Sequence, residues 1–416
     1  MNKKNQMVVF LAGLFLFFSG LSYWSFDNFL PQVKNAKSDE VDNESKNEEK
    51  KITGVLEFEG PKTEKCPING QLFTKEEKEI WEKRRPLLVM IENHVDSRPQ
   101  SGLQNADVVY EAIAEGGITR FIAVYYCNAV RGASKNYDVG PVRSARTYFL
   151  DIASEYSDYP LYAHVGGANC SAPKDPSTGR QSGPCTTQSK AQAIEQIAGY
   201  GWNNKGSWSD LSQFSLSYKV CRREKERTGE IRAAEHTMYC STEELWNVAE
   251  ERGLTNMTAM SKNSWDKDFD EWSFDEDGID SGTEAKSISF GFWGDDEYLV
   301  EWKYNQEANE YERYNADKKQ IDFNTEETLT AKNILIQFSK ESRSIDEHKH
   351  NLYEVIGSGK GVLLQNGKEI DINWSKKSRT ARTIFKNSSG KEIGFVPGRT
   401  WVEILPLGTK VEYASE

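Results

Sequence analysis

The sequence predicts a mixed α+β and α/β fold, in which an N-terminal transmembrane helix precedes an α/β domain and a smaller β-rich domain. An uncharged apolar run lies near the start of the chain, residues 86–252 alternate strand and helix patterns, and short strands separated by turns follow from residue 287. The predicted segments of the 416-residue chain are a cytoplasmic stub (1–6), a signal anchor (7–26), a disordered tether (27–51), an α/β domain (52–252), an acidic linker (253–286) and a β-rich domain (287–416).

The apolar run 7–26 is about twenty residues long, which is enough for a helix that spans a bilayer. Lys3 and Lys4 precede it and a polar, acidic segment follows it, so the N-terminus is expected inside the cell and the bulk of the chain outside. The run lacks a small-residue cleavage site, which favours an uncleaved anchor over a cleaved signal peptide. We therefore expect a single-pass protein of the cell membrane, with residues 31–51, which are mostly Lys, Glu, Asp, Asn and Ser, as a solvated tether.

Six cysteines follow the anchor, all of them before residue 241. An even number of cysteines in an exported chain indicates disulfides, and six cysteines allow fifteen connectivities. The shortest loops favour Cys170–Cys185 and Cys221–Cys240, which leaves Cys66–Cys127. The chain has no C-x-x-C pair, which argues against a zinc ribbon or a thioredoxin-like site.

The charge and the motifs exclude several classes of function. A formal net charge of −12 without a segregated basic stripe argues against a nucleic-acid partner, because the phosphates would be repelled. The chain also lacks a P-loop and a G-x-G-x-x-G fingerprint, so we expect no nucleotide cofactor, and we expect no cofactor of another kind.

Strand and helix patterns alternate within the predicted α/β domain. Thr74-Lys75-Glu76-Glu77 has the N-cap and acidic first turn of a short helix, and Ser241-Thr242-Glu243-Glu244 has the same pattern. Apolar residues at helical spacing predict helices over 146–157 and 190–197, and the Gly-, Ser-, Pro- and Thr-rich residues 165–188 predict a long loop. Strands are expected at Leu87–Ile91, Ala106–Tyr110, Phe121–Tyr126 and Leu161–His164.

The segment from residue 253 onward contains two specific turn patterns. Asn366-Gly367 between two strand-like runs predicts a hairpin with a type I′ turn. Residues 273–284 of the acidic linker imitate a calcium-binding EF-hand loop, but Ser273 stands where the motif has Asp and no flanking helices are evident. We therefore favour a solvated surface linker over a calcium site.

The stretch 86–167 alternates charged residues with strand-like runs, and charges are costly to bury unpaired. Glu111 and Glu115 stand four residues apart, and paired carboxylates are the groups that glycoside hydrolysis uses. Arg143 and Arg146 follow a Gly-Pro turn at a predicted helix start, where guanidinium and backbone N–H groups together bind carboxylate or phosphate.

We predict that these residues converge at one end of the sheet and form a ligand site. The predicted catalytic residues are Glu111, Glu115, His94 and His164. The predicted ligand-binding residues are Asn93, Arg98, Arg120, Arg143 and Arg146. The alternative is a partly buried ion-pair network that fixes the strand ends. No metal ligands are predicted, because a zinc site of His94, His164 and His236 is disfavoured against three structural histidines.

These motifs resemble the YerB family of bacterial exported proteins, a family of unknown function with N-terminal and C-terminal domains. The similar runs are Glu92-Asn93-His94, Arg98-Pro99-Gln100-Ser101-Gly102-Leu103, Glu115-Gly116-Gly117-Ile118-Thr119-Arg120-Phe121, Gly140-Pro141-Val142-Arg143-Ser144-Ala145-Arg146, Trp374-Ser375-Lys376-Lys377 and Pro397-Gly398-Arg399-Thr400-Trp401-Val402. The resemblance implies an envelope location and a two-domain build, and it implies no particular activity. Typical members are lipoproteins, whereas this chain lacks the lipid-bearing cysteine, and Ala234-Glu235-His236-Thr237 stands where the family tends to have Pro-His-Asn.

Two hypotheses of function are compatible with these residues. In the first, an anchored extracytoplasmic protein binds or processes a cell-wall glycan or another anionic envelope ligand through its Arg, Glu and His residues, with any enzyme activity being hydrolase-like. In the second, the protein is a non-catalytic adaptor or scaffold in the cell envelope.

Overall fold

The computed structural model describes residues 58–132, 137–204, 207–257, 263–279, 281–293 and 296–415. The predicted stub, anchor and tether, residues 1–51, lie outside these ranges. Within the described ranges, no helix combines the length and the apolar character that crossing a membrane requires. All described residues belong to a single compact unit.

Most of the regular structure is β-sheet, which overturns the predicted fold class. Twenty-six strands accompany only four α-helices in the described part of the chain. The prediction of a mixed α+β and α/β fold, with an N-terminal α/β domain followed by a smaller β-rich domain, is therefore wrong as a fold class. The helical patterns between strands form helices of only two or three turns, and strands from both halves of the chain pair in one sheet.

An eleven-stranded sheet forms the centre of the molecule. Its order is β12 (Thr283–Glu284), β22 (Lys368–Lys376), β21 (Gly357–Gln365), β18 (Asn333–Ser339), β25 (Thr400–Pro406), β4 (Val108–Glu115), β5 (Ile118–Tyr125), β3 (Leu87–Glu92), β7 (Leu161–His164) and β8 (Asp210–Ser212), with β23 (Ile384–Asn387) paired to β22. The parallel pairing of β25 with β4, from Thr400 opposite Val108 to Glu403 opposite Glu111, joins the two halves of the chain.

A six-stranded sheet packs against one face of the central sheet, which we call the inner face. It consists of β16 (Lys318–Lys319), β15 (Glu310–Asn315), β14 (Leu299–Asn305), β13 (Ser287–Gly291), β26 (Val411–Ala414) and, beside β15, β17 (Thr330–Ala331). Trp302 of β14 meets Trp401 of β25 edge to face, with ring centroids 5.2 Å apart. Apolar residues of both sheets are buried between them, so this interface is part of the core.

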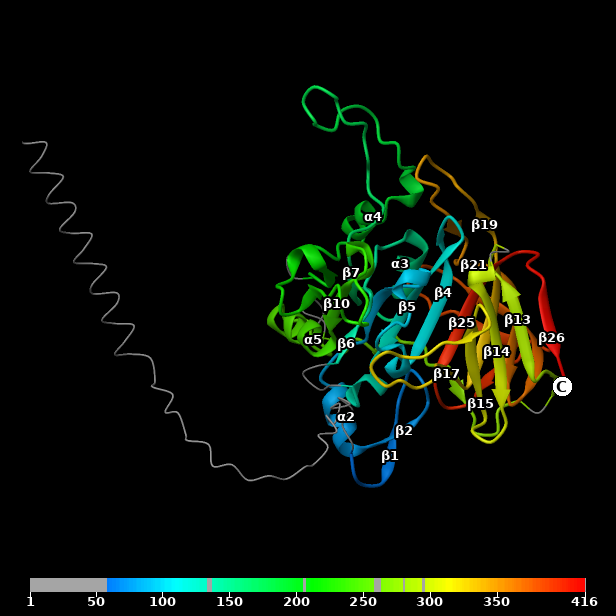
Figure 1. Cartoon of the computed structure of the whole chain (residues 1–416). Coiled ribbons are helices and arrows are strands. Elements are labelled where there is room, and N and C mark those ends of the chain that lie inside the picture. The colour runs from blue at the N-terminus through cyan, green and yellow to red at the C-terminus, as the bar shows by residue number, and fades with distance from the viewer. Residues whose placement is uncertain are drawn as a thin grey trace, which may run out of the picture. The chain divides into compact units, whose positions relative to one another are not determined.

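The helices lie on the opposite, outer face, on the other side of β4 and β5 from β13 and β14 (Figure 1). They are α2 (Lys75–Trp81), α3 (Thr147–Ala153), α4 (Ala193–Gly199) and α5 (Thr242–Glu251). Thr74 and Glu77 form the capping box of α2, and Ser241 caps α5, which confirms both predicted helix starts. Small sheets complete the fold: β6 (Asp138–Val139) with β10 (Met238–Ser241) and β9 (Cys221–Arg223), β1 (Lys62–Lys65) with β2 (Leu72–Thr74), β11 (Ser273–Phe274) with β24 (Gly394–Phe395), and β19 (Glu341–Ser342) with β20 (Leu352–Tyr353).

Several locally encoded features agree with the sequence. Asn366 and Gly367 have φ angles of 54° and 73° in the turn between β21 and β22, as a type I′ hairpin requires. The cysteines pair as Cys66–Cys127, Cys170–Cys185 and Cys221–Cys240, the three pairs expected from the sequence. The loop that contains Cys170–Cys185 projects from the body of the molecule above α4 (Figure 1). The segment with the EF-hand resemblance begins with strand β11 and ends with strand β12.

Candidate functional site

A β-bulge near the end of β4 separates the two predicted catalytic glutamates. In the pairing with β5, Ile113 lies opposite Thr119, but Glu115 lies opposite Ile118, so β4 has one extra residue at this point. Side chains alternate between the faces of a strand, and without the bulge Glu111 and Glu115 would share a face. The extra residue places Glu111 on the inner face and Glu115 on the outer face.

Glu111 belongs to a group of five polar residues on the inner face, which we call the inner cluster: Asn93, Glu111, Thr119, Arg313 and Glu403. Arg313 of β15 forms an ion pair with Glu111, and its Nε lies 3.8 Å from Oε1 of Glu403. Thr119 Oγ1 and Asn93 Nδ2 donate hydrogen bonds to Glu111 at 2.5 and 3.1 Å. All five side chains are fully buried, so a substrate has no access to Glu111 in this conformation.

Its surroundings favour the neutral form of the second carboxylate of the inner cluster, Glu403. Burial and the neighbouring Glu111 raise the pKa of Glu403 well above its usual range, although Arg313 opposes this shift. Trp302 Nε1 donates a hydrogen bond of 3.0 Å to Glu403. Arg313 contacts both carboxylates, and the cluster has the properties of a structural ion-pair network in the core.

Arg98 is also on this side of the sheet and links two loops. Its Nε and Nη2 donate to the side-chain and backbone oxygens of Asn93 at 3.2 and 3.1 Å, and its Nη1 donates to the backbone oxygen of Glu297 at 2.9 Å. Its guanidinium carbon lies 5.1 Å from the ring centre of Tyr298. These contacts separate Arg98 from the other predicted ligand-binding arginines.

The outer face holds a different set, which we call the outer cluster: Glu92, Glu115, Arg120, Arg143 and Arg146. Glu115 accepts hydrogen bonds from Arg120 through one oxygen and from Arg146 through the other, the latter from Nε at 3.1 Å. Glu92 accepts from Arg143 Nε at 2.9 Å. The structure therefore brings together three of the five predicted ligand-binding residues with one of the four predicted catalytic residues.

The backbone around Arg143 is extended and tied to two strands. The Arg143 N–H donates to the carbonyl of Met90 at 2.9 Å, and its carbonyl accepts from the N–H of Val165 at 3.1 Å. The N–H of Ala145 donates to the carbonyl of Gly166 at 3.0 Å. These bonds fix residues 143–146 across the ends of β3 and β7, which aims the two arginines at the outer face.

The outer cluster carries more positive than negative charge. Burial alone would raise the pKa of Glu115, but Arg120 and Arg146 outweigh it and hold this pKa at about 2. Burial, together with the neighbouring Arg146, lowers the pKa of Arg120 to about 10, so this residue remains cationic at neutral pH. Three guanidinium groups therefore face two carboxylates, one of them on Glu92, with an excess of one positive charge.

Solvent reaches one edge of the outer cluster. The side chains of Arg143 and Glu115 are 25% and 29% exposed, whereas those of Arg120 and Arg146 are 3% and 8% exposed. Nε is the atom through which Arg143 bonds to Glu92, and no described residue accepts a hydrogen bond from its two terminal nitrogens. The excess charge is thus presented to solvent at Arg143.

His164 is separated from this set by its own hydrogen bonds. Its Nδ1 lies 2.5 Å from the carbonyl oxygen of Gly166 and its Nε2 lies 2.8 Å from Oδ1 of Asp210. Both neighbours are acceptors, so the two bonds form together only when both ring nitrogens carry a proton. His164 is fully buried and leaves no nitrogen free to act as a base.

His94 lies beside His236 at the rim of the outer cluster. The two rings stack with their centroids 4.7 Å apart, and His236 Nδ1 lies 2.8 Å from Oε2 of Glu92. His94 accepts a hydrogen bond from the N–H of Asp96 at 3.2 Å. The predicted catalytic residues thus occupy four separate environments, two of them fully buried.

Sequence reasoning missed Glu92, Arg313 and Glu403. Arg313 lies between Tyr311 and Asn315 on the buried side of β15, and Glu403 lies among apolar residues of β25. A charge at such a position is a signal of a buried pair. Glu92 lies at the end of a strand in which every residue is buried. None of these signals identifies the partner, because the partners come from distant parts of the chain.

Comparison with known proteins identifies the family. Residues 72–178 match the family described as "Protein of unknown function (DUF3048) N-terminal domain", and residues 288–402 match its C-terminal domain. The chain belongs to this YerB-like family. It is 27% identical over 344 residues to "Putative lipoprotein YerB" of Bacillus subtilis (strain 168), which covers 82% of this chain and 86% of the relative.

A solved structure in the family has the same fold. The crystal structure of the YerB protein from Bacillus subtilis matches with a TM-score of 0.62 and 24% sequence identity, and the match covers 84% of this chain and all of the crystallised chain. The resemblance noted in the sequence is therefore confirmed across both family domains. This similarity supports an envelope-associated protein whose activity is uncharacterised.

Proposed function

We propose that the protein is anchored in the cell membrane, faces the outside of the cell, and binds an anionic group of a cell-wall glycan at the outer cluster. The single observation that carries the proposal is the excess guanidinium charge at Arg143, whose terminal nitrogens face solvent. A phosphate or carboxylate on an envelope polymer is the complementary ligand, because guanidinium binds both through paired hydrogen bonds. The lipoprotein name of the relative and the three disulfides support the location.

Binding is better supported than hydrolysis. A glycosidase that acts through two carboxylates needs both beside the scissile bond, with one kept protonated as the acid. Glu111 and Glu115 point to opposite faces of the sheet, and the low pKa of Glu115 keeps it ionised. A binding protein or adaptor requires neither condition.

The outer cluster can be tested with a matched pair of variants. Arg143 and Arg131 each donate from Nε to a buried glutamate at 2.9 Å, and both arginines are partly exposed. Arg131 pairs with Glu77 of α2, outside the outer cluster. We expect Arg143→Gln to reduce co-sedimentation of the full-length protein with purified cell walls and Arg131→Gln to leave it unchanged.

The same incubation separates binding from turnover. Soluble glycan products released by the wild type and lost in Glu115→Gln would establish hydrolysis, whereas retention without products establishes binding alone. Equal retention of wild type and Arg143→Gln would refute the proposed site.

The anchor has its own test. Full-length protein should fractionate with the membrane, and protease added outside the cell should remove its C-terminal part. A soluble form beginning near residue 25 would show that the segment 7–26 is a cleaved signal instead.

A further inference from the structure

His94, Asp96 and His236 lie close together beside the outer cluster, and neither the family nor the proposed function assigns them a role. One ligand atom from each residue lies within 4.8 Å of the other two. His94 follows β3, Asp96 lies in the short 3₁₀ turn Val95–Ser97, and His236 ends the turn Ala234–His236 before β10. Two imidazoles and a carboxylate are a donor set that suits Zn²⁺.

The surroundings of His236 resemble the support that metal-binding histidines usually have. Its Nδ1 lies 2.8 Å from Oε2 of Glu92, which leaves Nε2 as the nitrogen that can bind a metal ion. A carboxylate behind a ligating histidine fixes the orientation and the tautomer of its ring. Glu92 is itself held by Arg143 and is 3% exposed, so the support is rigid.

We infer that His94, Asp96 and His236 form a Zn²⁺ site, with Glu92 as the residue that orients His236. Ligand atoms bound about 2.0–2.2 Å from one ion lie at most roughly 4 Å apart, so the present group must contract slightly. The stacked rings, inclined by 16°, must also tilt so that both nitrogens point at one ion. The side chains of His94 and Asp96 are 27% and 66% exposed, and this exposure leaves them room to move.

The local charges are compatible with a cation. Three carboxylates lie in this region, because the exposed Glu235 is next to His236 in addition to Glu92 and Asp96. His236, Arg143 and Arg223 lie within electrostatic reach of Glu235. Asp96, a ligand of the proposed site, supplies a negative charge that attracts Zn²⁺ directly.

A second group of possible ligands, Cys66, Asp107 and Cys127, fails on its chemistry. The two cysteines form a disulfide and offer no thiolate, and burial raises the pKa of Asp107 to about 7. Among the described residues, the histidine group therefore has the better donor set. The inference goes beyond the proposed function, since Zn²⁺ binding is measured without any glycan.

The test is titration of Zn²⁺ into tag-free, full-length protein in detergent, followed by calorimetry and by competition with a colorimetric chelator. We expect one saturable site, with affinity reduced about tenfold or more in His94→Ala and in Asp96→Asn. Both side chains are solvent-accessible, so these variants should keep the wild-type thermal unfolding curve in the absence of zinc.

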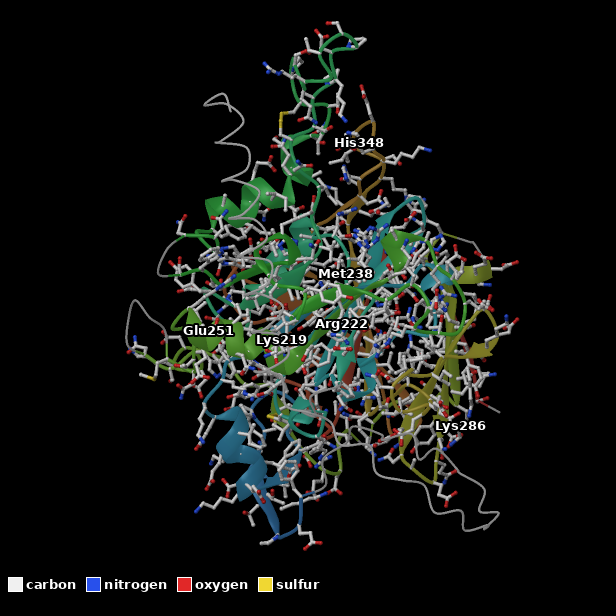
Figure 2. All side chains as sticks on the ribbon, turned by 60° about the vertical axis from the view of Figure 1, so that its left-hand side comes forward. Lys219, Arg222, Met238, Glu251, Lys286 and His348 are labelled. Carbon is white, nitrogen blue, oxygen red and sulfur yellow. A yellow bond between two sulfur atoms is a disulfide. The ribbon has the colours of Figure 1, made fainter. Side chains whose placement is uncertain are left out.

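His348→Ala is the matched control. His348 is exposed on a loop far from Met238, which lies two residues after His236 (Figure 2). This variant should bind Zn²⁺ as the wild type does. Three results would each overturn the inference. They are no saturable Zn²⁺ binding by the wild type, wild-type Zn²⁺ affinity in His94→Ala, and a loss of Zn²⁺ affinity in His348→Ala as large as that in His94→Ala.

Discussion

The two faces of the sheet at β4 and β5 use the same kinds of residue in opposite ways. On the inner face, Arg313 and Glu111 form a fully buried ion pair, and burial raises the pKa of the neighbouring Glu403, which favours its neutral form. On the outer face, Glu115 is shared by two arginines, and one edge of the cluster is open to solvent. Adjacent residues of one strand, Thr119 and Arg120, serve the two different clusters.

This difference shows that residue type alone does not identify a site. Both clusters contain arginine and glutamate, and both would appear as charged motifs in the sequence. A closed, balanced cluster holds the two sheets together, whereas an open cluster with excess charge can exchange partners with a ligand. Solvent access and charge balance therefore distinguish the structural cluster from the candidate site.

Breaking the inner ion pair should have the largest effect. Arg313→Met leaves the Glu111 carboxylate buried without its cation, which costs about 3–5 kcal/mol for a buried pair. The free energy of unfolding from urea titration measures this loss. Lys319→Met, which removes a surface ion pair with Glu312, should leave the free energy nearly unchanged. Similar losses in both variants would contradict the contrast between buried and exposed pairs.

The two faces should respond to pH with opposite signs. The pKa of Glu115 is about 2 in the folded protein and 4.5 ordinarily, so its stabilisation is complete above about pH 4.5 and is lost as the pH falls toward 2. The shift of the Glu115 pKa corresponds to roughly 3 kcal/mol. The stability difference between wild type and Glu115→Gln should therefore narrow on acidification.

Glu403 should show the reverse behaviour. Its pKa is raised on folding, so the wild type loses stability relative to Glu403→Gln as the pH rises above about 4.5, where the unfolded carboxyl ionises. Unfolding free energies of both variants and wild type between acid and neutral pH measure the two slopes. If the stability differences of Glu115→Gln and Glu403→Gln from the wild type change with pH in the same direction, the pKa values of Glu115 and Glu403 are not shifted in opposite directions.

The outer cluster should be stabilised by small anions. An anion that binds only the folded protein adds about 1.4 kcal/mol at ten times its Kd, and the gain should shrink at high salt. We expect inorganic phosphate to raise the thermal unfolding temperature of wild type and Arg131→Gln but not that of Arg143→Gln. An equal rise in all three proteins would place the phosphate elsewhere.

Local features of the fold were predictable from the sequence, and long-range pairings were not. The cap at Thr74, the turn at Asn366-Gly367 and the core of β3 depend on neighbouring residues, and each agrees with the structure. The pairing of β25 with β4 joins segments from opposite ends of the folded chain, and no local pattern encodes it. The predicted fold class was wrong for this reason.

The site was predictable only in part for a related reason. The Gly-Pro-Val-Arg run placed Arg143 and Arg146 near Glu115, as the structure has them. The bulge after Ile113 reverses the face of Glu115, and a one-residue shift in register is not visible in the apolar alternation of β4. The partner of Glu111 is Arg313 from the other half of the chain, so Glu111 could not be recognised as structural.

The smallest expected effect concerns the bulge that creates the two faces. Tyr148 of α3 donates a hydrogen bond of 2.6 Å from its hydroxyl to the carbonyl of Ile113, the last residue before the register shift. Tyr148→Phe should cost about 1 kcal/mol of unfolding free energy, the usual net value of one hydrogen bond.

Tyr162→Phe is the control, because the buried hydroxyl of Tyr162 has no hydrogen-bond partner among the described residues. Its removal should be neutral or slightly stabilising, since an unpaired buried hydroxyl is itself unfavourable. If Tyr148→Phe and Tyr162→Phe change the unfolding free energy by the same amount, the β4–β5 pairing alone holds the bulge. In that case α3 has no part in keeping Glu111 and Glu115 on opposite faces.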